Sequence, residues 1–93
     1  MENPSFDYKE FTVTREEAAV LDCAFDAIVY GMGHGRKNYQ PASWAVNTQG
    51  DHIHHAALHL QTWLMQRDGV ERADGHDHLA LALTRVALAA ACR

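Results

Sequence analysis

Cysteine, positive charge and long apolar runs are all scarce in this chain, and each shortage excludes a class of protein. The two cysteines, Cys23 and Cys92, form no C-x-x-C pair, and no signal peptide is recognisable, so we expect a reduced protein in the cytoplasm. Twelve acidic against eight basic residues give a formal net charge of −4, which argues against general nucleic-acid binding. No apolar run reaches the roughly 20 residues of a membrane span.

The 93 residues are enough for one domain, and an apolar content of 47% argues against disorder. A chain of this length buries only a modest core. We therefore expect marginal stability unless the protein associates with itself or binds something else.

Hydrophobic periodicity predicts an all-α fold, a small bundle of three main helices. The first is expected at 14–30, because Thr14 and Glu17 match a capping box and apolar residues follow at helical spacing. Gly31, Gly33 and Gly35 are expected to end it. Residues 1–13 show no helical period and predict a short extended arm.

A long loop is predicted at 31–50, where glycine and polar residues break any period. The second helix is expected at 51–68, with Asp51 as its cap and Gly69 as its stop. The third, at 75–92, is apolar nearly all round. Because no core of this size surrounds such a helix, we expect a dimer or a larger homo-oligomer.

Histidine, which binds metals and transfers protons, is abundant in this chain. Four of the seven histidines lie between 52 and 59, and two more flank Asp77. His55 and His59 are four residues apart on one helical face, a spacing at which two imidazoles reach one zinc-type ion. The alternative is a pair of histidines at the margin of the core, hydrogen-bonded to neighbours.

Asp22 and Asp26 form a similar pair on the first predicted helix. Two carboxylates at this spacing hold Mg²⁺ or Mn²⁺ beside a substrate phosphate, or else form a solvated flank of the helix. In the loop, Arg36 and Lys37 are the densest positive charge of the chain and suit an anionic ligand. Tyr39 and Trp44 either stack on a base or anchor the loop to the core.

Four short motifs follow one another over roughly two thirds of the chain. They are Tyr30-Gly31, Gly35-Arg36-Lys37-Asn38-Tyr39, Ala56-Ala57-Leu58-His59-Leu60-Gln61-Thr62-Trp63 and Asp74-Gly75-His76-Asp77-His78-Leu79-Ala80. In order and spacing they resemble the small phage and prophage dATP/dGTP diphosphohydrolase-like domain, a relative of the all-α MazG-like pyrophosphohydrolases. The chain departs from that pattern at His54, where the family often has an acid, and at Leu58, where it often has an arginine.

The resemblance implies metal-assisted hydrolysis of a nucleoside triphosphate between its α and β phosphates, in the cytoplasm of a host cell. MazG-like enzymes hold Mg²⁺ with acidic side chains, whereas this chain offers histidines, which suit Mn²⁺ or Zn²⁺ better. Either the metal differs, or catalysis has been lost and nucleotide binding remains. The predicted metal ligands are Asp22, Asp26, His55, His59 and His78. The predicted substrate-binding residues are Arg36, Lys37, Asn38, Tyr39 and Trp44.

Two other functions stay open at this stage. One is a non-catalytic phage protein that inhibits a host defence enzyme by covering its surface. The other is a structural role in which the histidines line an interface between copies and make assembly sensitive to pH. The general base of a hydrolase is not identifiable from the sequence.

Overall fold

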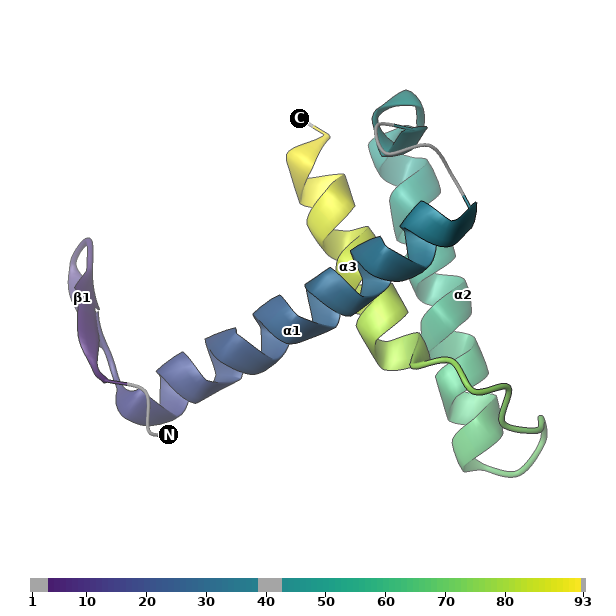
Figure 1. Ribbon diagram of the computed structural model, residues 1–93, viewed down its shortest axis with the longest axis horizontal. Coiled ribbons are helices and arrows are strands. Elements are labelled where there is room, and N and C mark those ends of the chain that lie inside the picture. The colour runs from purple at the N-terminus through teal and green to yellow at the C-terminus, as the bar shows by residue number, and fades with distance from the viewer. Residues whose placement is uncertain (1–3, 39–42, 93) are drawn as a thin grey trace.

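The computed structural model describes residues 4–38 and 43–92, and it confirms a mainly helical fold (Figure 1). Its helices are α1 (Arg15–Asn38), α2 (Gln49–Arg67) and α3 (His78–Ala91). A short antiparallel hairpin of β1 (Phe6–Tyr8) and β2 (Phe11–Val13) precedes them, and a 3-10 turn, η1 (Ser43–Val46), precedes α2. None of the helices described is long and apolar enough to cross a membrane.

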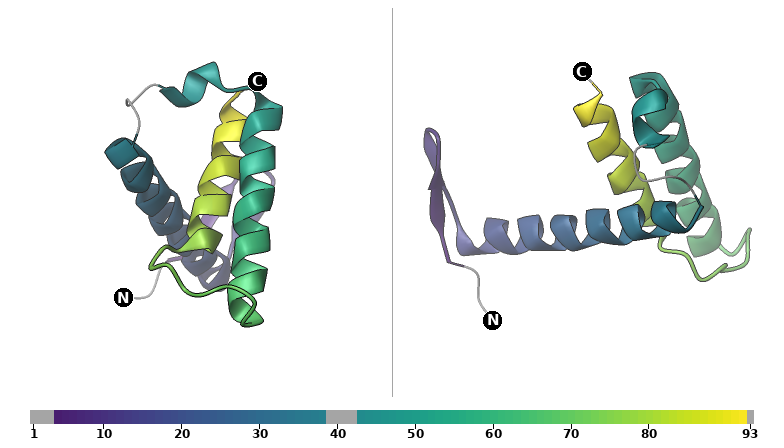
Figure 2. Two further views of the ribbon diagram at one scale, coloured as in Figure 1. Left: turned by 90° about the vertical axis from the view of Figure 1, so that its right-hand side faces the viewer. Right: turned by 45° about the horizontal axis from the view of Figure 1, so that its top comes forward.

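Helix α3 is the centre of the arrangement, because it packs against both α1 and α2 (Figure 2). The buried residues of α3 are mostly small, which lets both neighbours approach it. This position accounts for part of the apolar surface of α3, whereas Leu79, Leu83 and Val86 stay exposed on another face. The first half of α1 and the hairpin project away from α2 and α3 (Figure 1).

The crossing of α1 and α3 depends on Gly31. A Cβ atom at this position would overlap the side chain of Thr84 on α3. The Thr84 hydroxyl donates to the carbonyl oxygen of Ala80 at 2.9 Å and lies 3.4 Å from that of Ile28, across the crossing. Gly31 therefore serves close helix packing.

The prediction that three glycines end the first helix at residue 30 is wrong, because α1 continues to Asn38. Glycine lowers helix stability by only about 1 kcal/mol, and packing at Gly31 offsets that cost. The helix ends where the Asn38 side-chain amide donates to the carbonyl oxygen of His34 at 3.1 Å. The predicted loop 31–50 therefore loses its first eight residues to α1 and its last two to α2.

The other helix boundaries lie close to the predicted ones. The cap of α2 is Thr48 rather than Asp51, whose carboxylate accepts from the Thr48 backbone amide at 2.9 Å to complete a capping box. Gly69 follows the end of α2 with a φ of 78°, as expected of a stop glycine. Helix α3 begins at His78 rather than at 75, with Asp77 as its cap. The predicted extended arm is the β1–β2 hairpin.

Candidate functional site: a histidine cluster where the three helices meet

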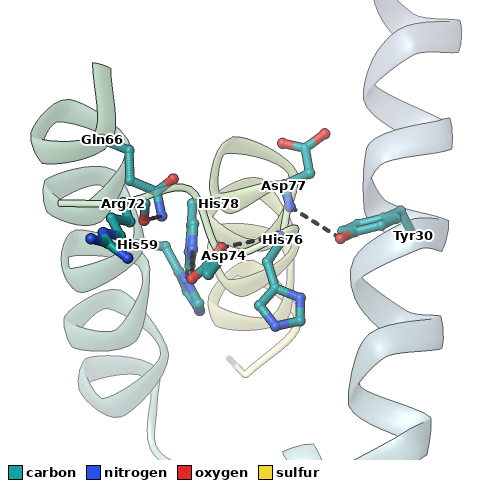
Figure 3. Close-up of polar contacts among 8 residues, drawn as sticks. All are labelled: Tyr30, His59, Gln66, Arg72, Asp74, His76, Asp77 and His78. Carbon is teal, nitrogen blue, oxygen red and sulfur yellow. Dashed lines mark hydrogen bonds and ion pairs between the residues drawn. The ribbon is translucent and has the colours of Figure 1, made fainter. Parts of the chain in front are cut away.

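Three side chains form a hydrogen-bonded chain at the start of α3. His78 is buried, and its Nε2 lies 2.8 Å from Oδ2 of Asp74 in the preceding loop. Its other ring nitrogen, Nδ1, lies 3.0 Å from Nδ1 of His59 on α2 (Figure 3). Asp74 lies four residues before His78, and this spacing brings the loop carboxylate within hydrogen-bond distance of the first residue of the helix. The result is a continuous chain from a carboxylate through two imidazoles.

The hydrogen bonds among Asp74, His78 and His59 fix which ring nitrogens carry protons. When the Nε2–H of His78 donates to Asp74, a neutral His78 accepts at Nδ1 from the Nδ1–H of His59. Nε2 of His59 then keeps its lone pair. Burial lowers the pKa of His59, and the neighbouring His78 lowers it further. The hydrogen bonds from the His78 ring and the His76 backbone amide hold the pKa of Asp74 well below its ordinary value.

Two further histidines extend the cluster towards α1. The ring centroids of His34, on α1, and His76, in the loop before α3, are 4.9 Å apart with the rings edge to face. The His76 ring is in turn 6.2 Å from that of His78, and the His78 ring is 5.2 Å from that of His59. Four imidazoles thus form one row from α1 to α2.

A cavity of about 830 Å³ opens beside the α1 end of this row. Its walls include Gly33, His34, Lys37 and Asn38 from α1, and Gly75 and His76 from the loop. The hydroxyl of Tyr30, which also lines the cavity, accepts from the backbone amide of Asp77 at 3.0 Å and fixes α1 to the start of α3. One lysine, two histidines and an asparagine therefore line one hollow, and these residue types suit an anion.

The structure assembles part of the predicted site. Of the five predicted metal ligands, His59 and His78 lie in contact. His55, Asp22 and Asp26 are exposed. Within 4–38 and 43–92, no three His, Cys, Asp or Glu side chains are arranged to hold a metal ion. The predicted five-ligand centre is therefore absent from the described part of a single chain.

The predicted substrate-binding residues divide in the same way. Lys37 and Asn38 line the cavity, and Arg36 lies next to them in the last turn of α1. Tyr39 lies outside the described residues. Trp44 is part of η1, away from this cavity, and lines a second hollow of about 480 Å³ together with Cys92.

One histidine of the 52–59 cluster is structural. His52 is completely buried, and its Nε2 lies 2.9 Å from the carbonyl oxygen of Trp44, to which it donates as a neutral ring. Arg85 on α3 donates to Nδ1 of His52 at 3.1 Å. Both ring nitrogens are satisfied, so His52 joins η1, α2 and α3 and is not free to bind a ligand.

Sequence reasoning missed Asp74, His34 and His76 as members of the site. The Asp74–His78 pair carries a readable signal, since a carboxylate four residues before a histidine is within reach of it. His34 gives no such signal while α1 is expected to end at residue 30. Once the helix extends to Asn38, His34 lies one turn before Lys37 and Asn38, on the same wall.

Comparisons with protein-family models, with curated proteins and with solved structures found no match to this chain.

Proposed function

We propose that the protein binds the phosphate groups of a nucleotide in the cavity between α1 and the loop before α3, and that it hydrolyses a nucleoside triphosphate there. The observation that carries this proposal is that Lys37, His34, His76 and Asn38 all line one hollow. These side chains supply hydrogen-bond donors and positive charge, the groups that phosphate oxygens bind.

The lining residues divide the work of binding. Lys37 places a compact charge against phosphate oxygens, and the Asn38 amide donates a directed hydrogen bond. Gly75 has a φ of 80° and no side chain, so the loop backbone can approach a ligand closely. The ring of Tyr30, which lines the same cavity, gives the nucleoside an apolar wall.

The α1 end of the histidine row supports the hydrolytic step, because His76 lies in the cavity wall. A water oxygen attacks phosphorus, the bond to the leaving phosphate breaks, and the His76 imidazole takes the proton of the water. The Asp74 carboxylate accepts from the His76 backbone amide at 3.0 Å and so positions this loop residue. A divalent ion bound to the triphosphate would offset the charge on its oxygens.

The test combines binding with turnover. Calorimetric titration with a panel of dNTPs and NTPs, and pyrophosphate and phosphate release with Mg²⁺, Mn²⁺ or Zn²⁺, are measured on the full chain. We expect Lys37→Ala and His76→Gln to weaken nucleotide binding about tenfold or more. The matched controls are Lys9→Ala in the hairpin and His54→Gln on the exposed side of α2, which should bind as the parent does.

Binding without turnover would leave a nucleotide-binding protein and remove the hydrolytic step. If no nucleotide binds, or if the control variants lose as much affinity as the cavity variants, the proposal is wrong. A non-catalytic interaction protein, which needs no ligand in this cavity, would then be the better hypothesis.

A further inference from the structure

The surface of a single chain is too large for a compact monomer. The accessible surface is 7124 Å², whereas a folded monomer of 10.4 kDa exposes about 5,400 Å². The radius of gyration is 15.3 Å, against about 12 Å for a compact chain of 93 residues. The excess area is about 1,700 Å² per chain, and the projecting half of α1 and the hairpin contribute to it (Figure 1).

An apolar stripe follows α1 outside its contact with α3. Leu21, Phe25, Val29 and Met32 are 52%, 68%, 50% and 50% exposed. Their spacing of four, four and three residues places them on one face of the helix. The face that packs on α3 is a different one, centred on Gly31. These four residues are called the α1 stripe below.

We propose that a second copy of this chain covers the α1 stripe, with the two α1 helices antiparallel. The area argues for a second copy, because obligate homodimer interfaces bury 2,000 Å² or more in total, and twice the excess per chain is about 3,400 Å². A contact of a surface with itself also closes after two copies, so it leaves no edge for further growth.

The charges on α1 argue for the antiparallel direction. Its first turn carries Glu16 and Glu17, and its last turn carries Arg36 and Lys37. The stripe is centred between residues 26 and 27, so antiparallel pairing places residue 21 opposite residue 32 and residue 17 opposite residue 36. Opposite charges and opposite ends of the helix dipoles then meet, whereas a parallel pair would place like charges together.

This pairing also adds a carboxylate to the cavity, a consequence that rests on the proposed nucleotide site. Asp22 follows Leu21 on the side of the stripe that carries Val29 and Gly33, two residues of the cavity wall. Asp22 of the partner subunit then lies opposite residue 31, at the edge of that wall. Carboxylate oxygens are the ligands that a nucleotide-bound Mg²⁺ or Mn²⁺ prefers, and one chain does not place Asp22 there.

Disulfide trapping tests the pairing without any nucleotide, so its result is independent of the proposed function. Leu21→Cys and Met32→Cys are made separately in a full chain that also carries Cys23→Ser and Cys92→Ser, with one of them tagged to differ in size. We expect a disulfide between the two chains when they are mixed, because opposed residues come within disulfide range. Each variant alone should link at least tenfold less, since like residues lie about 16 Å apart along the helices.

Val20→Cys mixed with Met32→Cys is the matched control, because residue 20 is exposed but lies about 100° away from Leu21 on the helix. If Leu21→Cys alone or Met32→Cys alone links as strongly as the mixture of the two, the antiparallel arrangement is wrong. Trapping in the control mixture as strong as in the test mixture would also overturn it.

Light scattering gives a second, independent measurement. We expect the parent chain at micromolar concentration to have about twice the mass of 10.4 kDa. Phe25→Glu should shift the mass towards that of one chain, whereas Val70→Glu, at a loop residue of almost the same exposure, should not. A monomeric parent chain, or a Phe25→Glu variant that stays dimeric, would overturn the proposal.

Discussion

Replacing Gly31 with alanine should destabilise the protein, although alanine is the better helix former. The added Cβ overlaps the hydroxyl, Cβ and Cγ2 of Thr84, so α1 and α3 have to separate at their crossing. Overpacking of this kind costs about 1–3 kcal/mol and more when backbone must move, against a helix-propensity gain of about 1 kcal/mol. Because α1 and α3 clash directly here, we expect a net loss of about 2 kcal/mol.

Gly33→Ala is the matched control, since its Cβ would meet nothing within 4 Å and the propensity gain should appear alone. The two variants should therefore differ by about 3 kcal/mol in the free energy of unfolding. Urea unfolding followed by circular dichroism, at one fixed protein concentration, measures that difference. A Gly31→Ala protein as stable as Gly33→Ala would refute the reasoning about the crossing.

The other predictions concern the cluster and its supports. His52→Ala should cost about 2–4 kcal/mol, because it leaves buried partners unpaired and a cavity behind, whereas the exposed His54→Ala should cost little in the same urea assay. Thr48→Ala should cost about 1 kcal/mol by removing a helix cap, and an unchanged urea midpoint would contradict the capping role. Asp74→Ala should lower turnover more than nucleotide affinity, and equal losses would argue against proton transfer to His76. The pKa of His59 is lower in the folded protein than in the unfolded chain, so the unfolded chain binds a proton at a higher pH. The neutral His59 therefore contributes fully to the free energy of unfolding above about pH 6.5, and this contribution declines as the pH falls towards the pKa of the folded protein. His59→Gln should remove that part of the pH dependence, and an unchanged profile would exclude His59 as its source.

The sequence predicted those helix ends that neighbouring residues determine. The Thr14–Glu17 capping box is present, with the Glu17 backbone amide donating to the Thr14 hydroxyl at 3.1 Å and the Thr14 amide to the Glu17 carboxylate at 3.0 Å. Gly69 ends α2 as expected. The error at Gly31 has a tertiary cause, because only the approach of Thr84 shows why a glycine is needed inside a helix.

The site was predicted in fragments for the same reason. The sequence identifies His59 and His78 as candidates from their positions on predicted helices. Their contact depends on the conformation of the loop between α2 and α3. The sequence does not predict the conformation of that loop. The 52–59 histidines look alike in the sequence, yet burial separates His52, which joins three elements, from His55, which is exposed.

The extension of α1 to Asn38 changes what the two neighbouring basic residues can do. In a loop, Arg36 and Lys37 would form one positive patch, and both were expected to bind phosphates. On a helix, consecutive side chains point about 100° apart. Lys37 lines the cavity, whereas Arg36 continues the α1 stripe four residues beyond Met32. If the stripe pairs two copies as proposed, Arg36→Glu should weaken the dimer and Lys37→Ala should weaken nucleotide binding. Light scattering and calorimetry on both variants measure the two effects, and a Lys37→Ala variant that loses the dimer together with nucleotide binding would contradict this division.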